Sequence, residues 1–281
     1  MMPLAVLASR VRFEEKQIFA ALERRHVPYV HLDTRRLTAE LDGKPAADLA
    51  GALNREISHH RGLYAALLLA AQGVTTVNRA EVITVCGDKL RTSLELVRAG
   101  LPTPRTAVAL TPEAGTAAAE RLGYPVVIKP LSGSWGRLAA VARDPAAAQA
   151  LLEHRAALPS PQQHIAYLQE LVDKPGRDIR VIVAGDEVIG ATYRYSEDWR
   201  TNASRGARSE PCPLTPELAA LARAAARAVG GGVLGVDLIE GPDGLVVLEV
   251  NHTVEFQGFQ AAHGDAVDVA DAIVGHVLET L

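Results

Sequence analysis

The sequence predicts an α/β (α+β) protein of three lobes, and three observations support this class. The chain has 281 residues, which is too long for one small core. Short apolar strands alternate with helical patterns in its first third, as in a parallel sheet covered by helices. Its last third contains a β-hairpin that carries polar side chains. We therefore expect an N-terminal parallel-sheet domain over residues 1–87, a central subdomain with a glycine-rich loop over 88–170, and a C-terminal subdomain over 171–281.

The expected elements of the first lobe follow from hydrophobic periodicity. Apolar runs predict strands over residues 4–8, 29–32 and 76–78, and helical spacing predicts helices over 13–24 and about 63–72. Strands and helices alternate in this order, so the sheet should be parallel.

The rest of the chain continues with less regular signals. In chain order we expect a helix over 89–99, a break over 100–104, a strand over 125–129, a glycine and serine loop, a strand and helix to about residue 154, an exposed connection over 159–161, strands over 165–170, 178–183 and 188–193, a polar loop-like segment to Pro213, a helix over 216–229, a hairpin over 235–251 and a closing helix over 267–281 that packs as a cap.

Composition excludes several classes of function. Hydrophobic residues make up 48% of the chain and charged residues 22%, and the net charge is -4 without a block of like charges. These values argue against a non-specific nucleic-acid surface, and the apolar runs are too short to span a bilayer. The first residues lack the basic and long apolar regions of a signal peptide, so we expect a cytoplasmic protein. Cys86 and Cys212 lack CxxC spacing and are interpreted as structural.

Three oxygen-bearing residues on the C-terminal hairpin suggest a magnesium site. Glu249 and Asn251 are two apart on one predicted strand and share a face, while Leu248 and Val250 should face the core. Asp237 can meet them from the neighbouring strand. Two carboxylates and one amide oxygen form the hard, incomplete ligand set that Mg²⁺ uses together with phosphates and waters. The alternative is an acidic strand end in solvent.

A loop of glycines and serines over residues 132–137 suits a polyphosphate. It follows a strand that ends in Lys129, and its backbone N–H groups can form an anion-binding nest. Lys129 and Lys89 could add point charges. The loop is not a Walker A motif, and no GxSxG or HExxH motif occurs. A plain β-turn with solvated lysines is the alternative.

Two further segments have open interpretations. Residues 169–172 could offer backbone groups to an adenine edge while Leu171 or Val172 packs against the ring, or they could be an ordinary strand followed by a Pro-Gly turn. Residues 194–206 form an arginine-dense, apparently loop-like stretch. Arginines in such a stretch bind carboxylates and phosphates bidentately or only add solubility.

The ordered set of these motifs resembles the ATP-grasp superfamily over nearly the whole chain. Within it the chain is similar to the RimK-like branch, and most closely to the LysX/ArgX ligases that act on a LysW-type amino-group carrier protein. The motifs that carry the resemblance are Gly87-Asp88-Lys89, Val127-Ile128-Lys129-Pro130, Gly133-Ser134-Trp135-Gly136-Arg137-Leu138, Gln169-Glu170, Lys174-Pro175-Gly176-Arg177-Asp178-Ile179-Arg180, Thr201-Asn202 with Arg205-Gly206, Asp237, and Glu249-Val250-Asn251-His252-Thr253 with Glu255-Phe256.

The resemblance implies a three-lobed ATP-grasp fold with a pre-ATP-grasp domain, and ATP-dependent formation of an amide. The C-terminal glutamate side chain of a small acidic carrier is phosphorylated, and the α-amino group of an amino acid then displaces the phosphate. By this resemblance ATP is bound by Lys89, Lys129, Ser132, Gly133, Ser134, Trp135, Gly136, Arg137, Gln169, Glu170, Leu171, Val172, Asp178, Arg180, Arg194 and Asn202; Mg²⁺ is bound by Asp237, Glu249 and Asn251; Arg180 and Arg205 are catalytic; and Arg194, Asn202, Arg205, Thr253, Gly258 and Phe259 face the substrates.

The amino-acid substrate is expected to be glutamate. In this family a Gly-Phe pair after the Asn251 motif marks members that use glutamate, and Gly258-Phe259 occupies that place. The pair could instead be a turn plus a core aromatic without a role in specificity. The alternative functions are the same reaction with 2-aminoadipate, glutamate ligation to a protein or peptide tail as in RimK, and an ATP-binding regulator without catalysis. The family also implies a homo-oligomer, either a tetramer or a dimer.

Overall fold

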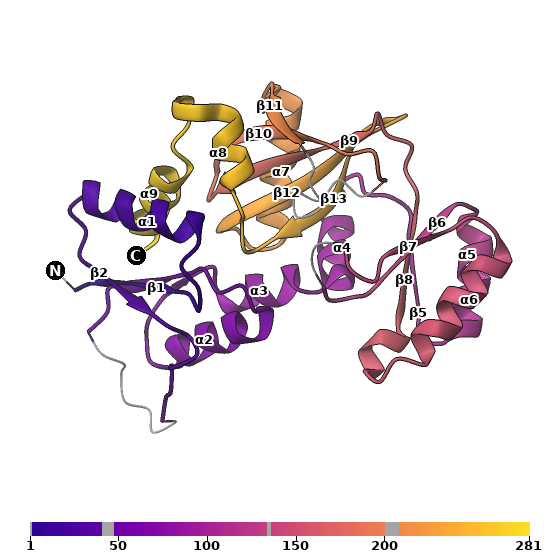
Figure 1. Ribbon diagram of the computed structural model, residues 1–281, viewed down its shortest axis with the longest axis horizontal. Helices are drawn as coiled ribbons and strands as arrows, with labels where there is room; N and C mark the ends of the chain where they lie inside the picture. Colours follow the sequence, from indigo (N-terminus) through magenta and orange to yellow (C-terminus); the bar gives the residue numbers. More distant parts are fainter. Residues whose placement is uncertain (1, 41–47, 134–135, 200–207) are drawn as a thin grey trace.

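The computed structural model describes residues 2–40, 48–133, 136–199 and 208–281, and within these ranges the strands form three sheets (Figure 1). Each sheet carries its own helices. The mixed α/β class expected from the sequence is therefore confirmed.

The N-terminal sheet has the strand order β2-β1-β3-β4, and its strands are parallel, as predicted. Its elements are β1 (Leu4–Leu7), α1 (Phe13–Arg24), β2 (Tyr29–Leu32), β3 (Gly51–Asn54), α2 (His59–Ala71), β4 (Thr76–Val77) and α3 (Ala80–Cys86). Helix α1 has the predicted bounds because Ile18, Ala21 and Leu22 recur at helical spacing and are fully buried. Strand β3 and helix α3 were not predicted.

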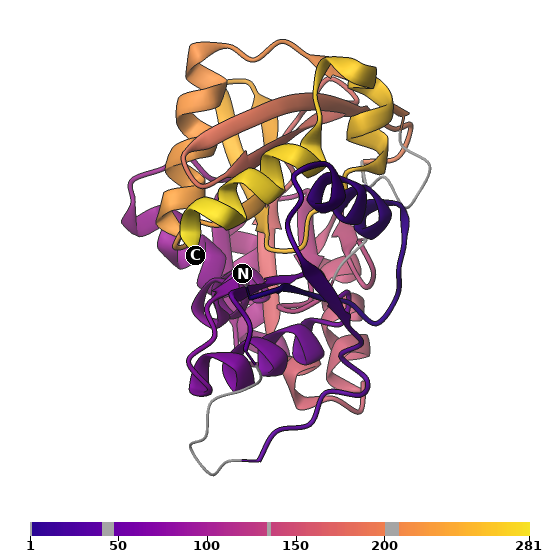
Figure 2. The same cartoon turned by 90° about the vertical axis from the view of Figure 1, so that its left-hand side faces the viewer.

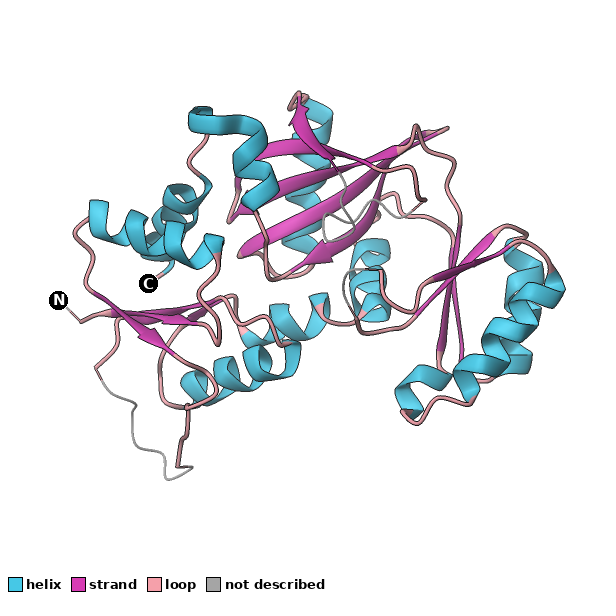
Figure 3. Cartoon of the chain, in the orientation of Figure 1, coloured by secondary structure: helices cyan, strands magenta, loops and turns pink. Residues whose placement is uncertain are grey.

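The central sheet has the order β5-β8-β6-β7 and is antiparallel. Its elements are β5 (Thr106–Ala109), α5 (Pro112–Leu122), β6 (Val126–Lys129), β7 (Ala140–Ala142), α6 (Pro145–Ala156), η1 (Pro161–His164) and β8 (Ala166–Glu170). Figure 3 shows α5 and α6 side by side on one face of this sheet, where Ala118, Ala148 and Leu152 pack against Ile128 and Leu168. The sequence did not indicate β5 or α5.

The C-terminal sheet has the antiparallel order β11-β10-β9-β12-β13. Its elements are β9 (Arg177–Ala184), β10 (Glu187–Tyr195), β11 (Arg208–Cys212), α7 (Pro216–Ala228), β12 (Val233–Gly241) and β13 (Gly244–Asn251). Helix α4 (Lys89–Arg98) packs here too, because its Leu96 joins the core formed by α7 and this sheet.

Two expectations for this sheet were wrong. Arg194 lies in strand β10 and not in a loop, because β10 is held on both sides by β9 and β11, and β11 occupies part of the segment expected to be irregular. Leu248 does not alternate into the core. Asp237 faces Glu249 while Leu238 faces Val247, so Leu248 is the extra residue of a β-bulge and Val247 takes the buried position.

The chain closes with α8 (Gln257–His263), η3 (Gly264–Ala266) and α9 (Val269–Thr280). Figure 2 shows α9 running between the C-terminal sheet and α1. One core joins the two lobes there, with Ile18 and Leu22 of α1 meeting Ile273 and Val277 of α9. The closing helix therefore packs as predicted. No helix among the placed residues has the length and apolar character needed to cross a bilayer.

Candidate functional site

The three predicted metal ligands meet on the strand pair β12–β13. Asp237 lies opposite Glu249 in the antiparallel register. The Nδ2 of Asn251 donates to the Oδ2 of Asp237 over 3.2 Å, which leaves the amide oxygen of Asn251 as a free acceptor in this pair. The bulge at Leu248 immediately precedes Glu249. The oxygen set predicted from the sequence is thus assembled in one place.

Asp237 is embedded in a buried network of alternating charges. Arg180 on β9 and Arg194 on β10 both contact its carboxylate, with Arg180 Nη2 at 2.9 Å and Arg194 Nη2 at 2.9 Å. Arg194 also binds Asp178 through two bonds of 2.7 Å. Burial by itself would raise the pKa of Asp237, but the charges of Arg180 and Arg194 outweigh it and hold the pKa below its ordinary value. Asp237 is consequently ionised at neutral pH.

This donor set fits a hard divalent cation. The side chains of Glu249 and Lys89 are 29% and 18% exposed, so the outer side of the site is accessible, while Asp237 is buried. Two carboxylates and an amide oxygen leave coordination positions for phosphate oxygens and water, as Mg²⁺ requires. Among the cations that neutralise these carboxylates, Lys89 lies on this accessible side, where phosphate oxygens would bind.

Lys89 links the hairpin to the glycine-rich loop. Its Nζ donates to the Oε1 of Glu249 over 3.1 Å and to the backbone oxygen of Gly133 over 3.0 Å. Helix α4 starts at Lys89 because the side chain of Asp88 accepts hydrogen bonds from the N–H groups of Leu90 and Arg91. The helix start thereby places the ammonium between loop and hairpin.

Lys129 ends strand β6 and points to Gln169 on the neighbouring strand β8. The Lys129 Nζ lies 2.5 Å from the Gln169 Oε1. Burial lowers the pKa of Lys129 to about 8, with Glu249 opposing this shift and Lys89 adding to it. A phosphate oxygen near this ammonium would stabilise its charged form.

Two glycines of the loop after Lys129 have positive φ values. Gly133 and Gly136 adopt φ values of 140° and 64°, which favour glycine. The hydroxyl of Ser132 accepts a hydrogen bond from Gln162 over 3.0 Å. Arg137 is exposed, and the predicted loop residues Ser134 and Trp135 lie outside the described residues.

The predicted adenine and ribose segment connects β8 to β9. The carboxylate of Glu170 accepts from the backbone N–H of Arg105 over 2.7 Å, and Leu171 and Val172 are partly buried after the strand ends. A Cβ on Gly241 would lie 3.2 Å from Val172, so this segment packs closely on the β12–β13 hairpin. The segment therefore lies between the two sheets that contribute Lys129 and Asp237.

Arg194 lies in β10, and the other predicted substrate residues divide into three groups. The hydroxyl of Thr253 lies 3.0 Å from the Nδ1 of His252, two positions beyond Asn251. Phe259 is 4% exposed in the core of α8 and α9 and stacks on His263 at 4.5 Å, next to Gly258. Asn202 and Arg205 lie outside the described residues.

The structure also contains polar contacts between the N-terminal lobe and the loop after Asn251 that we did not predict from the sequence. Arg55, 2% exposed, follows β3 and donates to the backbone oxygen of Val254 over 2.9 Å. Glu14 accepts from the N–H groups of Phe256 and Gln257. His59 lies with its Nδ1 3.4 Å from the Nε2 of His252. A charged pair directly after an apolar strand, Arg55-Glu56, was the available signal.

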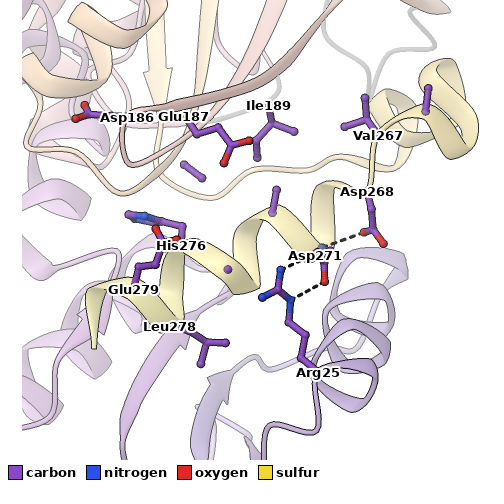
Figure 4. Close-up of a pocket in the computed structure, with 14 residues that line it drawn as sticks. Arg25, Asp186, Glu187, Ile189, Val267, Asp268, Asp271, His276, Leu278 and Glu279 are labelled. Atoms are coloured by element: carbon purple, nitrogen blue, oxygen red, sulfur yellow. Dashed lines mark hydrogen bonds and ion pairs between the residues drawn. The ribbon is translucent and has the colours of Figure 1, made fainter.

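One groove lies away from these residues, beside α9. The groove has a volume of about 810 Å³, and its lining includes Asp186, Glu187 and His276. Figure 4 shows it along α9, with Arg25 pointing to Asp271. The two bonds of this pair are 2.6 and 2.7 Å long. Five of its fourteen lining residues carry carboxylates, and three of these, Asp186, Asp268 and Asp271, pair with arginines. This acidic lining makes the groove a poor place for a polyphosphate.

Comparisons with known proteins match two domain families. Residues 86–277 match the RimK-like ATP-grasp domain, and residues 4–85 match the LysX preATP-grasp domain. The chain is 34% identical to the glutamate–LysW ligase ArgX of Sulfurisphaera tokodaii over 281 residues, which covers 99% of both chains. It is 38% identical to the alpha-aminoadipate–LysW ligase LysX of Saccharolobus solfataricus over 207 residues, which covers 73% of this chain and 75% of that protein.

Solved structures match over the full length as well. The crystal structure of a RimK domain protein ATP-grasp from Sphaerobacter thermophilus superposes with a TM-score of 0.82 at 30% identity and covers 98% of both chains. The ATP-grasp ligase PsnB, solved with a phosphomimetic variant of its minimal precursor, Mg and ADP, superposes with a TM-score of 0.76 at 21% identity over 100% of this chain and 99% of that one, which shows the shared fold.

Proposed function

Because the chain belongs to the RimK-like ATP-grasp family, we propose that it is an ATP-dependent carboxylate–amine ligase that joins the α-amino group of glutamate to the side-chain carboxylate of the C-terminal glutamate of a LysW-type carrier protein in amino-acid biosynthesis. The observation that carries the site assignment is the convergence of Lys89, Glu249 and the Gly133 backbone, next to Asp237 and Asn251. The full-length similarity to glutamate–LysW ligases supports the choice of substrates.

The reaction has two steps. A carboxylate oxygen of the carrier attacks the γ-phosphorus of ATP, the bond to the bridging oxygen breaks, and ADP leaves with the electron pair. The amine nitrogen then attacks the acyl carbon, phosphate departs with the electrons of the C–O bond, and the nitrogen loses a proton. Both steps depend on positioning and charge neutralisation and need no protein nucleophile, which is consistent with the lack of a Ser-His-Asp motif in the sequence.

The residues of the site have distinct proposed roles in these steps. Lys89 and Lys129 neutralise phosphate oxygens, and the 132–137 loop covers them and excludes water from the acyl phosphate. Asp237, Glu249 and Asn251 would hold Mg²⁺, which supplies further neutralisation of the phosphates when bound. Arg180, anchored to Asp237 with its side chain 15% exposed, is a candidate to stabilise the developing oxyanion, together with the sequence-predicted Arg205.

Glutamate is the proposed amino acid, and 2-aminoadipate is the second candidate. Glutamate is favoured because the matching glutamate–LysW ligases extend over 98–99% of the chain and because of the Gly258-Phe259 pair. Aminoadipate is supported by the 38% identity to a LysX enzyme. The two differ by one methylene, a difference that a pocket discriminates by about 1–3 kcal/mol.

The test is reconstitution with purified carrier, ATP, Mg²⁺ and either amino acid. We expect ADP and phosphate release that requires carrier and amino acid together, and a carrier mass increased by one glutamate residue. Mass gain on a ribosomal or peptide tail instead of the carrier would support the RimK-like alternative. Nucleotide binding without turnover on any of these acceptors would contradict a ligase function.

A further inference from the structure

A buried hydrogen-bond chain surrounds Gln169, which is 2% exposed. The Oε1 of Gln169 accepts from Lys129 at 2.5 Å. Its Nε2 donates to the hydroxyls of Thr106 and Tyr167, both at 3.1 Å. Gln169 therefore has partners on β5, β6 and its own strand β8, and its side chain is turned inward.

The partners allow only one orientation of the Gln169 amide. The hydroxyl of Thr106 donates to the backbone oxygen of Pro104 over 2.8 Å, so its oxygen is left to accept from Gln169. The Tyr167 hydroxyl is 2.8 Å from the Ser93 Oγ and can direct its proton there. Turning the amide over would place its NH₂ group against the Lys129 ammonium and its oxygen against two oxygens. The amide is therefore locked with its oxygen towards Lys129.

We propose that Gln169 is a positioning residue that holds the Lys129 ammonium for the nucleotide phosphates, with Thr106 and Tyr167 fixing the amide, and that its side chain does not contact the adenine. This inference rests on the proposed nucleotide site. Lysine has a flexible four-carbon side chain, and a fixed acceptor reduces the rotamer freedom that it loses on binding phosphate. Tyr167 also ties this arrangement to α4 through Ser93, so the same chain reaches the helix that starts at Lys89.

Equilibrium binding of ADP and of adenosine distinguishes a role of Gln169 in positioning Lys129 from a direct contact with adenine. ADP with Mg²⁺ carries phosphates, whereas adenosine reports on the base and ribose alone. We expect Gln169→Met to weaken ADP binding about tenfold, the value of one hydrogen bond to a charged group, and to leave adenosine binding within about twofold of wild type. Equal losses for ADP and adenosine would overturn the proposal and support a contact with adenine.

A double-substitution cycle tests whether Gln169 acts through Lys129. If it does, Lys129→Met alone and Lys129→Met with Gln169→Met will bind ADP equally, within about twofold. If the two substitutions lower the ADP affinity by factors that multiply in the double variant, Gln169 acts independently of Lys129 and the positioning role is refuted. If Gln169→Met does not fold, Thr106→Val replaces it in both tests, with an expected ADP loss of about threefold.

The outcome is separable from that of the proposed function, because neither binding experiment uses a carrier. If wild-type protein binds ADP and the variants give the expected result in the double-substitution cycle, but no carrier is modified, only the ligase assignment is refuted. Wild-type protein that fails to bind ADP would refute the nucleotide site and this inference with it.

Discussion

Replacing Arg194 by methionine tests the buried charge network beside the candidate metal site. The Arg194 side chain is 7% exposed and contacts two carboxylates, Asp178 and Asp237, whose side chains are 4% and 6% exposed. The three contacts are 2.7, 2.7 and 2.9 Å long. Methionine preserves most of the apolar stem but removes the charge that both carboxylates share.

The expected loss of stability is about 3–5 kcal/mol, the usual cost of removing one partner of a buried ion pair. Asp237 keeps Arg180, so a value near the lower end is expected. The pKa of Asp237 is lowered in the folded protein, so its stabilising contribution is present above the unfolded pKa of about 3.9 and is lost as the pH falls through the folded pKa. Without Arg194 the folded pKa rises, and the loss on acidification begins at a higher pH.

The assay is urea unfolding followed by circular dichroism at pH 7 and at about pH 3.5, below the unfolded pKa of the carboxyl group. Arg227→Met is the matched control, because Arg227 pairs with Asp186 at a similar 2.7 Å while the two side chains are 63% and 69% exposed. Such exposed ion pairs contribute little to the free energy of unfolding. If both variants unfold at the same urea concentration, the reasoning from burial is wrong.

Three further outcomes are expected. ADP affinity should fall as the pH rises through about 8, because Lys129 loses its proton there, and Lys129→Met should remove this pH dependence in calorimetric titrations. Glu249→Gln should leave the unfolding midpoint unchanged yet abolish Mg²⁺-dependent turnover in an ADP-release assay; wild-type rates would exclude Glu249 as a ligand. Phe259→Ser combined with Gly258→Asn should raise the aminoadipate to glutamate ratio of kcat/KM by up to about tenfold, and should also destabilise the protein by roughly 3 kcal/mol because Phe259 is buried. An unchanged substrate ratio would remove the specificity argument.

Most of the elements with strong periodicity were predicted from the sequence, and several weaker ones were not. Helix α1 was predicted with its observed bounds because its buried residues recur at helical spacing. Strand β5 was not predicted because its four residues, three of them partly exposed, show no clear alternation. Helix α5 begins after Thr111, whose side chain accepts from the Ala114 N–H, but a glycine and an alanine run obscured its apolar face.

The candidate site was likewise predicted only in part from the sequence. The sequence indicated that Glu249 and Asn251 share a strand face and that Asp237 can reach them, because a short turn dictates which strands pair. It did not indicate the bulge at Leu248, since a register shift depends on both strands and on what packs behind them.

By itself, then, the sequence determined the chemical groups of this protein: the oxygen-bearing side chains of the hairpin, the two lysines and the glycine and serine loop that contributes to the family resemblance. Only the tertiary structure decided their neighbours. Arg194 proved to lie inside a charge network, and Gln169 to face Lys129. Both facts depend on strands far apart in the chain meeting in one register, and pairing between distant strands is set by the packing of whole sheets, not by any local pattern.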